Sequence, residues 1–127
     1  MQYIVKTNKT VAQAFEDLKV SITNHKFSVL HVHDLHATFN SKGIDFDNEC
    51  LILEVCNPNF ASKILNTNMS LNMALPCRIS VYKDKGETNI GMMLPTALIQ
   101  AFTDDKKLLE IAAEVEEINK QIIDKVK

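Results

Sequence analysis

Two cysteines in this sequence stand where thiol chemistry is plausible. Cys56 ends an apolar segment and directly precedes Asn57-Pro58, which is typical of a helix start, and Cys77 opens a later β-prone segment. A thiol beside a helix N-terminus meets the positive end of the helix dipole, which favours the thiolate. The pair therefore allows a thiol-dependent redox enzyme or sensor, with Cys56 as nucleophile and Cys77 as resolving thiol. The alternative is that both thiols pack as small apolar side chains.

Arg78 is the only arginine among fourteen basic residues. Its planar guanidinium holds a carboxylate or phosphate through two parallel hydrogen bonds, which lysine cannot do. The partner could be internal, with Glu54 and Glu49 as candidates, or it could be an anionic ligand. Asn57 lies at a predicted helix N-terminus, where backbone N–H groups also favour an anion. We therefore take Asn57 and Arg78 as candidate ligand-binding residues.

Three histidines lie within six residues, at His31, His33 and His36. Imidazoles bind zinc, copper, iron or nickel, so these residues are weak candidates for a metal or haem site. The spacing has no fixed geometry, and a fourth ligand would have to come from elsewhere in the chain. Solvated histidines at a strand end are the simpler interpretation, so we assign no metal and no cofactor. His36 is also a candidate general base or a hydrogen-bonded structural histidine.

Hydropathy patterning predicts the elements that must position these residues. Strands are expected at 2–7, 27–33, 50–56, 77–83 and 87–93, and helices after Thr10, after Asn57, from Pro95 and after Thr103. The segment 35–42 alternates as a strand would, but stop signals at both of its ends favour a short helix. Residues 66–75 are expected to form a loop or an irregular turn. The resulting fold class is α+β: a two-layer sandwich of about five strands and two long helices on one face, with short helical insertions.

Composition limits the class of protein. The length of 127 residues predicts one domain over 1–127, and the net charge of −2 argues against a nucleic-acid partner. Neither a run of 18 apolar residues nor an apolar stretch typical of a secretory signal is present, so we expect no membrane partner. Three cysteines without a C-x-x-C pair fit a reducing cytoplasm.

The stretches HDLHATFNSKGIDF, LEVCNPNFASKIL and ALPCRISVYKDKGETNIGMMLP, in this order, resemble the domain-of-unknown-function 302 family. The most specific pieces are Asn57-Pro58, Leu75-Pro76, His36 with Gly43, and Pro95. The resemblance covers the whole chain. It implies a β-α-β4-α domain, often a dimer, without an established activity. Many relatives carry Phe-Gly at Val55-Cys56 and an aliphatic residue at Cys77, so thiol chemistry would belong to a subgroup of the family.

Three functions follow as hypotheses. The first is a homodimeric module that binds a small anionic or thiol-reactive ligand at the strand ends, between the loops around Cys56-Asn57 and Cys77-Arg78, with His36 nearby. The second is the thiol enzyme or sensor, with His36 as its base. The third is a metal- or haem-binding protein that uses His36.

Overall fold

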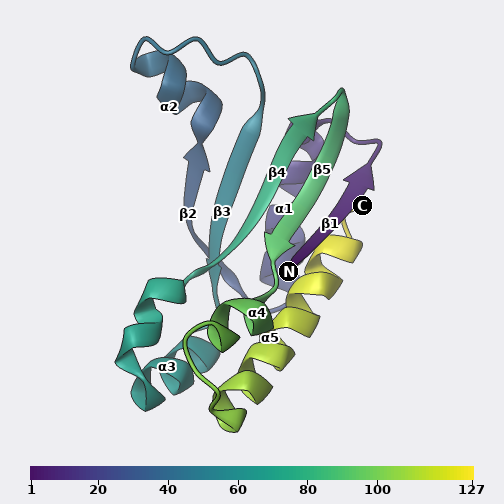
Figure 1. Ribbon diagram of the computed structural model, residues 1–127. Coiled ribbons are helices and arrows are strands. Elements are labelled where there is room, and N and C mark those ends of the chain that lie inside the picture. The colour runs from purple at the N-terminus through teal and green to yellow at the C-terminus, as the bar shows by residue number, and fades with distance from the viewer.

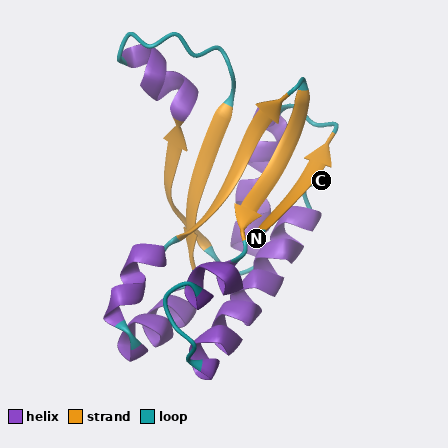
Figure 2. Ribbon diagram, viewed as in Figure 1, coloured by secondary structure: helices purple, strands orange, loops and turns teal.

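One antiparallel sheet of five strands, in the order β1-β5-β4-β3-β2, organises the chain. The computed structural model describes residues 1–127. The strands are β1 (Gln2–Thr7), β2 (Ser28–Asp34), β3 (Cys50–Cys56), β4 (Cys77–Asp84) and β5 (Glu87–Met93). The helices are α1 (Val11–Asn24), α2 (Leu35–Ser41), α3 (Pro58–Thr67), α4 (Pro95–Gln100) and α5 (Lys106–Asp124), with a 3-10 helix, η1 (Met69–Ala74). The predicted α+β fold class is confirmed (Figures 1 and 2).

Alternation along the strands gives the sheet two different faces. In β4, which lies between β3 and β5 in the sheet, Ile79 and Val81 are fully buried. Arg78, the residue before Ile79, is exposed. The buried side packs against apolar residues of α1 and α5, such as Leu18 and Ile122. In the view of Figure 1, α1 lies behind β4 and β5, and no helix covers the front of the sheet. We call this uncovered side the open face.

Side-chain caps fix the helix starts largely as the sequence predicts. Thr10, Asp34 and Asn57 each accept a hydrogen bond from a backbone N–H in the first turn of the helix that follows. The last helix is a correction, because its N-cap is Asp105 and not Thr103. The Thr103 hydroxyl instead accepts the Asp105 N–H at 3.1 Å, which forms a turn ahead of the helix.

Residues 66–75 are more regular than the predicted loop or irregular turn. Helix α3 continues to Thr67, and η1 follows after a single residue, Asn68. The Asn68 side chain accepts the Ser70 N–H at 3.0 Å and so caps η1. The segment is too short to show a helical repeat of apolar residues, so its sequence does not indicate a helix. Local hydrogen bonds of asparagine side chains stabilise its turns.

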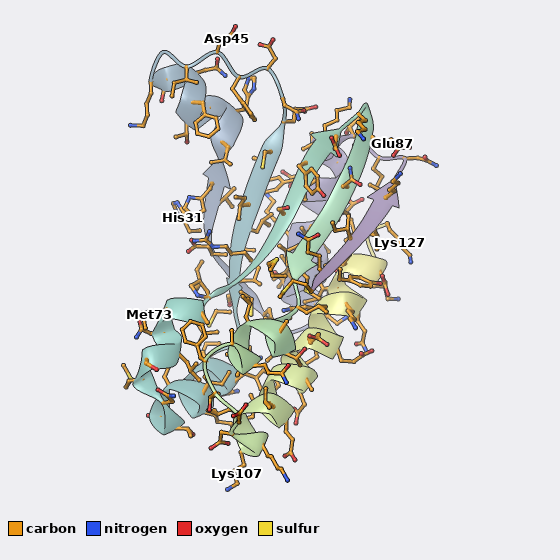
Figure 3. All side chains as sticks on the ribbon, in the orientation of Figure 1. His31, Asp45, Met73, Glu87, Lys107 and Lys127 are labelled. Atoms are coloured by element: carbon orange, nitrogen blue, oxygen red, sulfur yellow. The ribbon has the colours of Figure 1, made fainter.

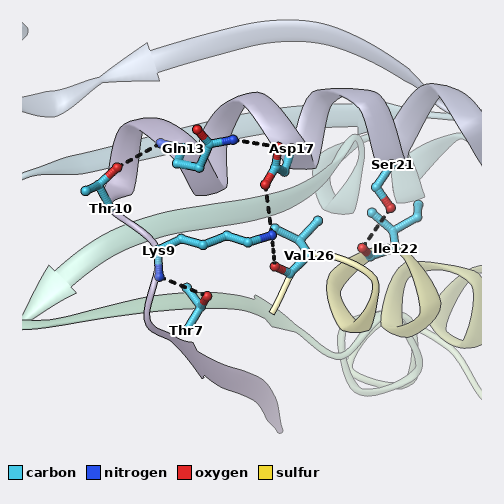
Figure 4. A network of polar contacts seen from close by, with 8 residues as sticks. All are labelled: Thr7, Lys9, Thr10, Gln13, Asp17, Ser21, Ile122 and Val126. Carbon is cyan, nitrogen blue, oxygen red and sulfur yellow. Dashed lines mark hydrogen bonds and ion pairs between the residues drawn. The ribbon is translucent and has the colours of Figure 1, made fainter.

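Polar contacts fix the end of α5 against α1 (Figure 4). The buried hydroxyl of Ser21 donates to the Ile122 carbonyl at 2.9 Å. The Lys9 ammonium lies 2.6 Å from the Val126 carbonyl and 2.8 Å from the Asp17 carboxylate. These contacts set the position of the last turns of α5 over the sheet.

The short helices gather at the two ends of the sheet. Helix α2 lies beyond the end of β2, whereas α3, η1 and α4 cluster at the opposite end, which we call the lower end (Figure 1). None of the helices combines the length and the apolar character that crossing a bilayer would require.

Candidate functional site

The two central strands β4 and β5 separate at the lower end of the sheet. Their ladder runs from Asp84–Glu87 at the hairpin to Ser80–Gly91 and stops there. Below that point, β4 pairs only with β3, through Val55–Cys77, and β5 pairs only with β1. Figure 1 shows β4 bending toward β3 while β5 continues toward α4.

Local sequence explains the tight hairpin between the two strands and the points at which each strand ends. At the hairpin, Lys85 and Gly86 both have positive φ, of 52° and 79°, as a two-residue turn that matches strand twist requires. At the lower end, Pro76 precedes β4 and Pro95 follows β5. Proline has no N–H to donate to a ladder, so each strand ends at its proline, whereas the β4–β5 pairing already stops at Ser80–Gly91.

The separation creates a pocket of about 490 Å³ on the open face. We call it the sheet-end pocket. Strands β1, β3, β4 and β5 contribute to it, and η1 and α4 close its lower side. Its walls are mainly apolar, and Ile4, Met73, Leu75, Met93 and Leu98 are among them. Figure 3 shows Met73 on the left of the view, below His31 and well above Lys107.

Gly91 lets β1 lie close to β5 because it has no side chain. It lies in the middle of β5 and lines the pocket opposite Ser80. A Cβ atom placed on Gly91 would lie 3.0 Å from Ile4 Cγ1 and 3.3 Å from the Tyr3 carbonyl oxygen. Glycine weakens a strand interior, and it often marks a place where another group approaches the backbone closely.

Arg78 lies at the rim of the pocket and contacts Glu54, the internal partner proposed from the sequence. The guanidinium Nη2 is 3.7 Å from Glu54 Oε2, and 64% of the Arg78 side chain remains exposed. His33 Nε2 lies closer to the same carboxylate oxygen, at 2.7 Å. The hydrogen bond from His33, and then the nearby positive charges, lower the pKa of Glu54. Most of the guanidinium therefore stays available to a ligand.

His31 and His33 stack edge to face on the open face, with ring centroids 4.5 Å apart. His36 is on α2, where its Nδ1 lies 3.0 Å from the Asn48 carbonyl oxygen. No group of three or more His, Cys, Asp and Glu side chains is arranged to hold a metal ion. His36 is thus at the opposite end of the sheet from Cys56 and Cys77, because β2 and β3 separate them. From the sequence we expected His36 to lie near these thiols, and for the thiols of the same chain this expectation is wrong.

Cys56 and Cys77 both lie at the lower end of the sheet, since Cys77 pairs with Val55 in the β3–β4 register. Both are free thiols, and Cys77 lines the sheet-end pocket. The expected lowering of the Cys56 pKa is wrong: burial raises it. The N–H groups of Asn59 and Phe60 donate to the Asn57 side chain, so these helix donors are not free for a thiolate.

Burial raises the pKa of the Cys77 thiol to about 11, and the neighbouring Cys56 adds to the rise. The amide of Asn119 lies close to this thiol and opposes the rise, without forming a hydrogen bond of good geometry. Cys50 is at the other end of β3, and burial raises its pKa as well. None of the three thiols is set up as a reactive thiolate.

Asn119 is the residue of this site that the sequence interpretation missed. It lies on the sheet-facing side of α5, is completely buried, and belongs to the lining of the sheet-end pocket. Neither Oδ1 nor Nδ2 has a hydrogen-bond partner. A signal was present in the sequence, because Asn119 follows Val115 by four residues and precedes Ile122 by three, within the apolar stripe of the helix.

A smaller apolar pocket of about 260 Å³ adjoins the first one. Cys56, Phe60 and Leu65 are among its lining residues. It shares the segment from Ala74 to Cys77, together with Pro95 and Leu98, with the sheet-end pocket. Of the polar groups that could orient a ligand, Arg78, Ser80, Tyr82 and Asn119 line the larger pocket, whereas Asn57 and Asn72 line the smaller one.

The fold and the pocket define a class of α+β domain in which one antiparallel sheet carries helices on one face and an open pocket on the other. Residues 3–126 match the family described as "Domain of unknown function DUF302", and the chain belongs to this family. The crystal structure of an uncharacterized conserved DUF302 protein from Bacillus stearothermophilus is similar to it, with 35% sequence identity and a TM-score of 0.94. The alignment covers 99% of this chain and 98% of that one. A comparison with curated proteins gives no match.

Proposed function

We propose that the chain is a small-ligand-binding module and that the ligand occupies the sheet-end pocket. The observation that carries the proposal is the separation of β4 and β5 below Ser80–Gly91, which opens the pocket between two strands that are paired elsewhere. Ligand sites are typically concave and mostly apolar, with a few polar groups that fix orientation. This pocket has that composition.

Gly91 lines the pocket without adding a side chain to it. Its conformation is not one that only glycine adopts, since its φ is not in the positive range. A Cβ atom on Gly91 would crowd Ile4 and the Tyr3 carbonyl, so close packing against β1 accounts for glycine at this position. A larger side chain here would have to displace β1 or extend into the pocket that Gly91 lines.

The ligand that fits this surface has an apolar body, because Ile4, Leu75, Met93 and Leu98 form much of the wall. An anionic substituent, as expected from the sequence, would meet Arg78 at the rim. A covalent reaction with Cys77 is disfavoured, because its thiol pKa is raised to about 11. The homodimer expected from the family resemblance remains part of the proposal, and light scattering across protein concentrations would measure it.

The test is a titration of the ¹⁵N-labelled protein with benzamide, acetophenone and benzoate, which share one aromatic ring. We expect amide shifts to concentrate at Ser80, Gly91 and Met93. Gly91→Leu should abolish them by filling the pocket. Ser80→Leu fills it from β4 if the β5 variant fails to fold, and Thr38→Leu, on the distant helix α2, is the control. Absence of binding by all three compounds, or unchanged binding by a folded Gly91→Leu or Ser80→Leu variant, would contradict the proposal.

A further inference from the structure

The inner wall of the sheet-end pocket holds a polar group that the protein itself does not satisfy. Asn119 is completely buried, and its amide offers two donor hydrogens and one acceptor oxygen without a hydrogen-bond partner for either heavy atom. Buried polar groups in proteins are nearly always paired, so each exception requires an explanation.

The surroundings of Asn119 explain why no protein group pairs with it. It lines the pocket with Cys77, Met92, Pro95 and Leu98, whose side chains offer it no strong donor or acceptor. The Cys77 thiol is close, but sulfur is a weak partner. The β4–β5 ladder ends at Ser80–Gly91, and the buried amide belongs to the lining of the pocket that forms beyond that pair.

We propose that Asn119 is the anchor for the polar end of the ligand, and that the ligand carries a neutral carboxamide-type group on an apolar body. This inference rests on the proposed function and specifies the class of ligand. A primary amide or a lactam presents one donor and one acceptor side by side, so it can form two hydrogen bonds with the asparagine amide at once.

The same geometry discriminates between related ligands. A ketone or a carboxylate only accepts, so it would pair with Asn119 Nδ2 and leave Oδ1 unsatisfied. A carboxylate would in addition lose its hydration next to Met92 and Leu98. Sites that hydrogen-bond a polar group reject analogues that lack it, because buried polar atoms are then left unpaired. Asn119 therefore selects the inner group, whereas Arg78 at the rim meets whatever extends toward solvent.

The ring compounds used to test the proposed function also test this inference. We expect benzamide to bind about tenfold more tightly than acetophenone, the difference that one additional well-made hydrogen bond supplies. The Asn119 side-chain NH₂ resonances of the unmodified protein should shift with benzamide in the same titration. In Asn119→Leu, which keeps the branched shape of the side chain, benzamide should lose two hydrogen bonds and acetophenone one, so both should bind more weakly and the preference for benzamide should disappear.

The outcomes separate the two claims. If none of the compounds binds, both the pocket and its anchor are refuted. If benzamide and acetophenone bind the pocket equally, or if Asn119→Leu retains the preference for benzamide, the ligand site stands and the assignment of Asn119 is wrong. Unshifted Asn119 NH₂ resonances at saturating benzamide would lead to the same conclusion without any variant.

Discussion

Replacing Asn119 with leucine should stabilise the protein in the absence of ligand. Leucine has the same number of side-chain heavy atoms and the same branching, but nothing to hydrogen-bond. Both amide atoms of Asn119 lack partners, and the residue is completely buried. Relief of an unsatisfied buried polar group is worth about 1–3 kcal/mol. Most core substitutions have the opposite sign.

The size of the effect follows from the chain length. Unfolding entropy of about 2.1 cal/mol/K per residue gives about 0.27 kcal/mol/K for 127 residues, so Tm should rise by about 4–11 °C. Urea unfolding and calorimetry measure the two quantities independently. The matched control is Asn89→Leu. Asn89 is also buried, but its Nδ2 donates to the Glu87 carbonyl at 3.1 Å, so this variant should lose about 1 kcal/mol. A loss of more than 1 kcal/mol in Asn119→Leu would show that the amide is satisfied, and the reasoning would fail.

Four further predictions concern the residues first identified in the sequence. Asn57→Ala should lower the free energy of unfolding by about 1 kcal/mol in urea, because the side chain caps α3. Asn57→Asp should retain most of that stability, and an unchanged urea midpoint for the alanine variant would contradict the assignment of Asn57 as a cap. Arg78→Lys should change stability by less than about 0.5 kcal/mol, because the guanidinium is largely exposed and its contact with Glu54 is long; a larger loss would indicate a bidentate role. His33→Phe should raise the pKa of the Glu54 carboxyl in an NMR titration, because the His33 hydrogen bond is the main cause of its lowering. A lowered carboxyl pKa stabilises the fold above the unfolded-state pKa, and this contribution is lost as pH falls through the folded-state value; an unmoved Glu54 titration would contradict the assignment. Iodoacetamide should label Cys77 in the native protein slowly at pH 8 and faster toward pH 11, because its thiol pKa is raised to about 11; rapid labelling near pH 6, located by mass spectrometry, would restore the thiol-enzyme hypothesis.

The elements of the fold were predictable because their signals are local. The nearly continuous apolar run of β3 and the cap-proline pair Asn57-Pro58 each lie within a few neighbouring residues. The start of α5 was misplaced because Thr103 and Asp105 are both good capping residues. Only the hydrogen bond that Thr103 accepts from Asp105 decides which of them begins the helix.

The site was predictable only in part, because strand register decides it. The sequence indicated the segments around Cys56 and Cys77, which the fold does bring to one end of the sheet. It gave no means of knowing that β2 and β3 carry His36 to the other end. Asn119 was visible as a polar residue on an apolar stripe, but its missing partner depends on where β4 and β5 separate.

The measurement that tests the central claim most directly is a crystal structure of the protein soaked with benzamide. We expect the compound between the Cys77–Ser80 segment of β4 and the Gly91–Met93 segment of β5, with its ring against Leu75 and Met93. Density confined to the smaller pocket beside Phe60, or to the open face around His31, would contradict the assignment of the sheet-end pocket as the ligand site.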